Sequence, residues 1–106
     1  MAATGIPLEK TVTESDVGYR YLYLNKNDTY AAIVSNLSSK KKETLAKGEA
    51  FVEIPAVDAN TCELYHVKLK DKGYCYHMKE VRWLLVVGKT VVFRWNNNID
   101  ALEVFH

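Results

Sequence analysis

The segment from Cys62 to Val87 constrains the fold more than any other part of this 106-residue chain. It reads CELYHVKLKDKGYCYHMKEVRWLLVV and contains both cysteines, two of the three histidines and the longest apolar run. Residues 63–69 alternate between two sets of side chains, and Lys70-Asp71-Lys72-Gly73 has the composition of a tight turn, in which glycine can adopt a positive φ. We therefore predict a β-hairpin here, at the centre of a sheet.

Composition and spacing predict more strands around this hairpin. Seven tyrosines, two tryptophans and three phenylalanines accompany many valines and threonines, the residue types that are enriched in strands. Strand patterns also occur in four further segments, residues 19–25, 29–37, 50–57 and 90–95. The predicted fold class is therefore mainly β, a small antiparallel sheet or SH3-like barrel of five to seven strands with one or two short helical pieces.

The length predicts a single domain over residues 1–106, because two domains would each be too small to bury a core. Residues 1–12 show no clear periodicity and contain Gly5 and Pro7, which favours a loose N-terminal arm. Pro55 cannot donate a backbone hydrogen bond, so the strand over residues 50–57 is expected at an edge or strand end. Pairing of that edge with a second copy offers one route to a homodimer.

Three segments allow two interpretations each. Residues 76–87 form either a helical turn at 78–80 followed by a strand, or one amphipathic helix that ends at Gly88, because apolar residues recur there at helical spacing. Residues 41–47 form either a short helix or part of a mobile loop. Residues 98–106 form either a last strand or a short helix that begins at Asn98.

The net charge of +1 is evenly distributed along the chain. Residues 1–53 hold seven basic and seven acidic side chains, and residues 54–106 hold seven and six. This balance argues against a strongly basic nucleic-acid surface or a membrane-binding patch. The run from Trp83 to Val87 is far shorter than the roughly 20 residues of a membrane span, and no secretory leader is recognisable. With only two cysteines, a cytoplasmic protein with free thiols is expected.

Histidine and cysteine in the hairpin suggest one metal site. If the loop is the two residues Asp71-Lys72, His66 lies directly opposite His77, and Cys75 lies diagonally on the same face. Two imidazoles and a thiolate are suitable zinc ligands, and a fourth position would stay open. The hypothesis depends on the strand register, because a slip of one residue places the two histidines on opposite faces.

Motifs for enzymatic catalysis are missing from the sequence. Gly88-Lys89-Thr90 matches the end of a phosphate-binding loop, but Trp83 stands where that motif requires glycine. Glutamates are scattered over alternating strands, and there is no GxSxG nucleophile elbow. We therefore expect a protein that is not an enzyme and that uses no cofactor.

Tyrosines supply the candidate partner-binding residues. In a strand over residues 19–25, the three side chains of Tyr19, Tyr21 and Tyr23 share one face, while Leu22 and Leu24 point to the core. This tyrosine ladder serves either cross-strand packing or the binding of a partner. Arg20, Tyr74 and Tyr76 complete the candidate set, because arginine and tyrosine are enriched at interface hot spots.

Three functions follow from these features. The leading hypothesis is a small non-enzymatic module that docks on a macromolecular partner, most readily a protein, as an inhibitor or adaptor of the kind that phages and mobile elements often encode. The alternative is a binder of single-stranded nucleic acid or nucleotides that uses Tyr19, Arg20 and Tyr21, with the lysines at 40–42. The third is a small zinc protein centred on His66, Cys75 and His77.

Overall fold

The computed structural model describes residues 6–106, and residues 1–5 lie outside the described part. Within residues 6–106, seven strands form one sheet in the order β1-β6-β7-β3-β4-β5-β2. The elements in chain order are β1 (Leu8–Thr11), α1 (Glu14–Tyr19), β2 (Leu22–Asn25), α2 (Lys26–Ala32), the 3-10 helix η1 (Val34–Asn36), α3 (Ser39–Ala46), β3 (Val52–Asp58), β4 (Leu64–Asp71), β5 (Cys75–Lys79), the 3-10 helix η2 (Arg82–Leu84), β6 (Thr90–Asn96) and β7 (Ala101–Phe105).

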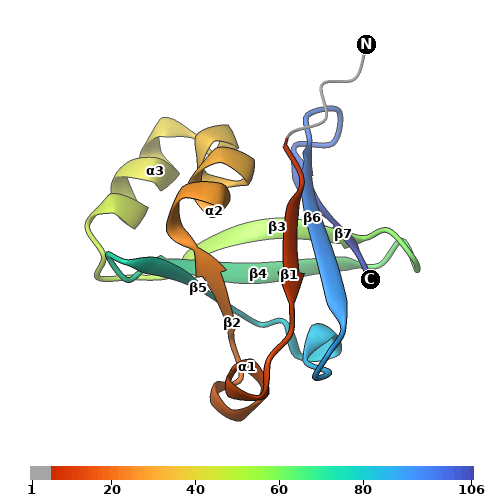
Figure 1. Cartoon of the computed structure of the whole chain (residues 1–106). Helices are drawn as coiled ribbons and strands as arrows, with labels where there is room; N and C mark the ends of the chain where they lie inside the picture. The colour runs from red at the N-terminus through yellow and green to blue at the C-terminus, as the bar shows by residue number, and fades with distance from the viewer. Residues whose placement is uncertain (1–5) are drawn as a thin grey trace.

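The sheet curls into a nearly closed barrel (Figure 1). Strands β1, β6 and β7 run steeply across the direction of β3 and β4, while α2 and α3 lie together at one side. Neighbouring strands are antiparallel except for β3 and β7, which pair in parallel from Ala56 to Asp58. The prediction of a mainly β fold with short helical pieces is confirmed, although the helical pieces are more numerous than expected.

Alternation along the strands fills the barrel with apolar side chains. On β6, Val91, Phe93 and Trp95 are buried, as their shared face predicted. Leu22 and Leu24 on β2 are buried as expected, at 0% and 2% exposure. Burial of each such side chain contributes about 1.5–3 kcal/mol, so these strand faces supply much of the stability.

Asp16 bridges the gap between β1 and β2, the two strands at the ends of the sheet order. Its carboxylate is fully buried and accepts hydrogen bonds from the backbone N–H groups of Thr13 and Tyr23 at 2.8 and 3.0 Å. It also lies 3.1 Å from Nζ of Lys10 on β1. Burial alone would raise the pKa of Asp16, but these hydrogen bonds and the ammonium group hold it below its ordinary value.

The hairpin of β4 and β5 exists, but its register differs from the prediction. Lys70, and not His66, lies opposite His77, while His66 lies opposite Pro55 on β3. The turn lies two residues further along the chain than assumed, because Asp71 pairs with Tyr76 and the N–H of Lys72 donates to the carbonyl of Cys75 at 2.9 Å. Gly73 adopts φ 87° in this turn and donates its N–H to the carboxylate of Asp71. The assumed pairing of His66 with His77 is therefore wrong.

Residues 81–87 form neither the predicted strand nor part of a helix over 76–87. Strand β5 extends to Lys79, and Glu80 then takes φ 63°, which breaks the extended backbone. The 3-10 helix η2 follows and buries Val81 and Leu84 in the core. Val86 and Val87 remain half exposed, so only the earlier part of this apolar run packs into the core.

Two other predicted strands are helical or shorter. The expected strand over residues 29–37 is occupied by α2 and η1, because Asn25 caps α2 by accepting a hydrogen bond from the N–H of Asp28. The expected strand over residues 19–25 begins only at Leu22, since α1 continues to Tyr19. Thr13 and Asp16 form a capping box that starts α1. The predicted short helix at 41–47 is confirmed as α3, and residues 101–105 form the predicted last strand.

Strand β3 lies inside the sheet, between β7 and β4, so the expectation that residues 50–57 form an edge is wrong. Pro55 is tolerated because the pairing with β7 begins only at Ala56. A homodimer through this edge is therefore not supported. The loose arm predicted for residues 1–12 is also wrong for Leu8–Thr11, which is strand β1, while residues 1–5 lie outside the described part.

Candidate functional site

A cluster of aromatic side chains covers the outer surface of β2 and β5. Tyr23 lies directly opposite His77, and both point outward because their neighbours Leu22, Leu24 and Met78 point to the core. We call this cluster the tyrosine face and define it as Tyr19, Tyr21, Tyr23, Tyr74 and His77.

The rings of the tyrosine face pack in a continuous series. The ring centres of Tyr19 and Tyr21 are 5.7 Å apart, and those of Tyr21 and His77 are 4.1 Å apart, with both pairs stacked. Tyr23 contacts His77 at 4.6 Å in a tilted arrangement. Tyr74 completes the series with a hydroxyl 2.8 Å from that of Tyr23. The prediction that Tyr19, Tyr21 and Tyr23 lie together therefore agrees with the structure, although Tyr19 belongs to α1.

Exposure is greatest at the two ends of the tyrosine face. Tyr19 and Tyr74 are 66% and 71% exposed, while Tyr21 and Tyr23 are half buried. The hydrogen bond with Tyr74, and then burial, raise the pKa of the Tyr23 hydroxyl, and burial raises that of Tyr21. Tyr21 and Tyr23 thus keep neutral hydroxyl groups at neutral pH, and an apolar ring with a polar tip is typical of an interface anchor.

His77 is the buried centre of the tyrosine face. Its residue exposure is 8%, and its Nε2 atom is buried without a hydrogen-bond partner among the described residues. Burial lowers the pKa of His77, and the positive charges of Lys72, Lys70 and Lys79 lower it further. The imidazole is therefore neutral at neutral pH, and no charge on it balances the nearby lysines.

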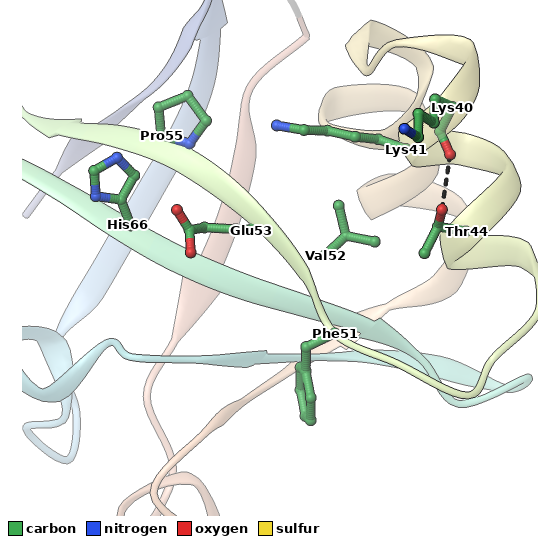
Figure 2. Close-up of a pocket in the computed structure, with 8 residues that line it drawn as sticks. All are labelled: Lys40, Lys41, Thr44, Phe51, Val52, Glu53, Pro55 and His66. Atoms are coloured by element: carbon green, nitrogen blue, oxygen red, sulfur yellow. Dashed lines mark hydrogen bonds between the residues drawn. The ribbon is translucent and has the colours of Figure 1, made fainter.

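Three lysines lie close enough to His77 to influence its titration, and we call Lys70, Lys72 and Lys79 the lysine rim. None of the three forms an ion pair within residues 6–106. Nζ of Lys79 and of Lys70 lie 4.7 and 5.4 Å from the ring centre of Phe51, which holds the two cations near each other. Figure 2 shows Phe51 pointing away from the lysines of α3.

A hollow of about 650 Å³ adjoins the tyrosine face at Tyr19 and the lysine rim at Lys79. Arg20 and Arg82 line it together with a single acidic residue, Glu80. Arg20 reaches this place because it adopts φ 64° as the C-cap of α1. The arrangement groups three cations against one anion, so the hollow is suited to a negatively charged group.

Cys75 lies beside this face as a buried free thiol. Burial raises the pKa of Cys75, and the contacts with Tyr23 and Lys72 only partly oppose the effect. The thiol is therefore protonated at neutral pH, which makes it a weak nucleophile and a poor metal ligand.

Tyr76 and His66 do not belong to this site. Tyr76 is 2% exposed and packs in the core below α2, so its assignment as a partner-binding residue is wrong. His66 is four residues from Lys70 along β4, about 13 Å away along the strand, and so the predicted set of His66, Cys75 and His77 does not assemble. Within residues 6–106, no three His, Cys, Asp or Glu side chains are grouped closely enough to hold a metal.

A hydrogen-bond network around Asp58 was not predicted from the sequence. Asp58 is buried, and its carboxylate lies 2.6 Å from Nε2 of His106 and accepts a hydrogen bond from Nε1 of Trp83 at 2.9 Å. Backbone N–H groups of Asn60 and Thr61 donate to its other oxygen. Burial opposes ionisation, but these donors hold the pKa of Asp58 below its ordinary value. The network fastens β3, η2 and the end of β7, which is a structural role.

A second hollow, of about 520 Å³, lies between α3 and the outer side of β3 and β4 (Figure 2). Lys40, Lys41 and Thr44 border it from α3, while Glu53, Pro55 and His66 border it from the strands. Its charged groups are exposed or half buried and carry both signs. We therefore regard the tyrosine face, which combines exposed aromatic rings with unpaired cations, as the stronger candidate.

Among residues 6–106, no helix has the length and apolarity that crossing a membrane requires. Comparison of the chain with protein-family models and with curated proteins gives no match. Functional assignment therefore depends on the chemistry of the surface.

Proposed function

We propose that this protein is a non-enzymatic binding module that docks on a protein partner through the tyrosine face. The observation that carries the proposal is the exposure of Tyr19 and Tyr74, at 66% and 71%, at the ends of a packed aromatic series. Tyrosines that are held by their neighbours lose little side-chain entropy when a partner covers them, and such residues dominate the energy of many interfaces. In this proposal the module acts in the cytoplasm as an inhibitor or adaptor by occupying the partner's surface.

The stacking within the tyrosine face favours a protein over a nucleic acid. Single-stranded nucleic acids bind to open ring faces, on which their bases stack. Here the ring of Tyr21 already stacks with Tyr19 and with His77, side chains of the same molecule. Hydroxyl groups and ring edges are left for a partner, and these suit the polar groups and apolar side chains of a protein.

Site-specific photo-crosslinking tests the proposal. A photo-reactive phenylalanine analogue replaces Tyr19 or Tyr74 in the full chain, which is irradiated in an extract of the source cells. Tyr30 on α2 provides the matched control, because it is 49% exposed and lies outside the tyrosine face. We expect a discrete crosslinked protein from positions 19 and 74 that excess unlabelled protein competes away. Equal products from position 30, or products that resist competition, contradict the proposal.

Binding of single-stranded nucleic acid is the second candidate, and the lysine rim is the observation that favours it. Lys70, Lys72 and Lys79 could contact phosphates while Tyr19 offers its free ring face to a base. Fluorescence anisotropy with labelled single-stranded RNA and DNA tests this function. Salt-dependent, saturable binding that is lost in Tyr19→Ser would support it, and its absence at low salt would eliminate it.

A further inference from the structure

The positive charges around the tyrosine face lower the stability of the folded protein, because they repel one another. Lys68 lies directly opposite Lys79 on the paired strands, and Lys70 lies directly opposite His77. The like charges of Lys68 and Lys79 destabilise the sheet in this cross-strand pair, whereas the neutral imidazole of His77 offers Lys70 no compensating charge. Lys68 lies opposite Glu53 on β3. Within the described residues, no carboxylate forms an ion pair with Lys79 or Lys70.

Other parts of the structure bring more cations to the same region instead of dispersing them. Phe51 holds Lys70 and Lys79 over one ring, and Arg20 and Arg82 line the hollow that Lys79 also borders. The whole chain carries a net charge of only +1, so this concentration is local. An interface of complementary charge would relieve the repulsion and would set the orientation of the partner.

We infer that the partner presents an acidic segment whose carboxylates pair with the lysine rim and enter the hollow between Arg20 and Arg82. This inference rests on the proposed docking function and specifies the chemistry of the partner. A protein segment fits better than a nucleic acid, because the ring of Tyr21 already stacks with side chains of the same molecule and only carboxylates are needed to meet the cations.

Anisotropy titrations with a fluorescein-labelled polyglutamate peptide test the inference. The test variant is Lys70→Gln/Lys72→Gln/Lys79→Gln, and the control is Lys40→Gln/Lys41→Gln/Lys47→Gln, which removes the same charge from α3 and its C-cap. We expect the test variant to weaken binding by roughly tenfold and the control by less than about twofold. A single-stranded oligothymidylate of equal charge should bind more weakly than polyglutamate.

Three results would overturn the inference: no saturable binding of polyglutamate, an equal loss in both triple variants, or tighter binding of oligothymidylate. Circular dichroism and thermal unfolding confirm that each variant is folded. Photo-crosslinking from Tyr19 and Tyr74 distinguishes failure of the acidic-partner inference from failure of the proposed docking function. If a competable partner crosslinks to the wild type and equally well to the lysine-rim variant, docking stands and the acidic partner is rejected.

A spectroscopic readout locates the binding on the protein. The imidazole signals of His77 should shift when polyglutamate binds, because His77 lies within the field of all three rim lysines. Those of His66, which lies on β4 opposite Pro55, serve as an internal control and should stay in place. Movement of His66 without His77 would place the peptide in the hollow beside α3 and reject the assignment.

Discussion

The buried carboxylate of Asp16 accepts a hydrogen bond from the backbone N–H of Tyr23 and thereby joins α1 to β2. Through Lys10 the same carboxylate reaches β1, at the opposite end of the sheet order. The Asp16 side chain therefore connects β1 and β2, the two end strands that meet at the seam of the barrel. It also holds β2 in place, the strand from which Tyr23 projects outward. Asp16 therefore supports both the closure of the barrel and the position of the tyrosine face.

Replacement of Asp16 should weaken the whole fold. Asp16→Asn keeps the shape of the side chain but removes the charge that Lys10 and the backbone donors require. We expect the free energy of unfolding to fall by about 1–3 kcal/mol, measured by chemical denaturation. Glu14→Gln, an exposed change in the same helix, should alter it by less than about 0.5 kcal/mol. Equal effects of the two changes would argue against the seam contact.

Acid should destabilise the protein through Asp16 and Asp58. The folded protein holds the pKa of both carboxyls below the ordinary value of 3.8, so it binds these protons more weakly than the unfolded chain does. Their contribution is complete above that ordinary value and is lost as pH falls through the lower folded pKa. Thermal unfolding between about pH 6 and pH 2 should show the decline, with a shallower slope in Asp16→Asn. An unchanged slope would exclude Asp16 as a source.

Tyr74 and Tyr76 should respond in opposite ways to truncation. Tyr76 is buried, with the ammonium of Lys26 4.5 Å from its ring centre, so Tyr76→Ala should cost about 3–5 kcal/mol of stability. Tyr74 is largely exposed, so Tyr74→Ala should cost less than about 1 kcal/mol. Urea denaturation measures both. A similar loss in the two variants would contradict the observed hairpin register.

Removal of the lysine rim should change the titration of His77. The pKa of His77 is lowered first by burial and then by the rim charges, so the Lys70→Gln/Lys72→Gln/Lys79→Gln variant should raise it while leaving it below the ordinary value of 6.5. Titration of the imidazole by NMR measures the shift. The α3 triple variant is the control, and a change of the same size there would mean that net charge, and not position, governs the pKa.

Asp58 should be essential for the connection between β3 and β7. Asp58→Ala leaves the donor groups of Trp83, Asn60 and Thr61 without their acceptor, and we expect a loss of about 3 kcal/mol. Asp28→Ala on α2, an exposed position, should cost less than about 0.5 kcal/mol. Thermal unfolding checks both changes, and the emission of Trp83 should change in the first variant only.

Local alternation was sufficient to predict part of the fold and of the site. Leu22 and Leu24 are buried and the nearby tyrosines cluster, because a strand separates its side chains between two faces whatever its partners are. The short helix α3 was one of two interpretations of residues 41–47, the other being a mobile loop. These features depend only on neighbours in the sequence.

The errors arose where a single residue or a distant partner decides the outcome. The apolar run at 83–87 has strand composition, but Glu80 takes a positive φ and turns the chain into η2. The position of the turn decides which residue faces His77, and the composition of residues 70–74 does not determine that position. The lysine rim was missed for the same reason, because it requires the register of β4 with β5 and the position of Phe51.

The position of β7 has a consequence for how the protein is made. This strand is synthesised after the other six, yet it is inserted between β6 and β3 and divides the sheet order into two groups. Until it emerges from the ribosome, β3 and β6 each expose an unpaired edge, and such edges invite aggregation. We expect residues 6–100 to stay unfolded, and to need protection by chaperones, until β7 has emerged. Folding then begins with the closure of contacts between distant parts of the sequence, which is a slow step.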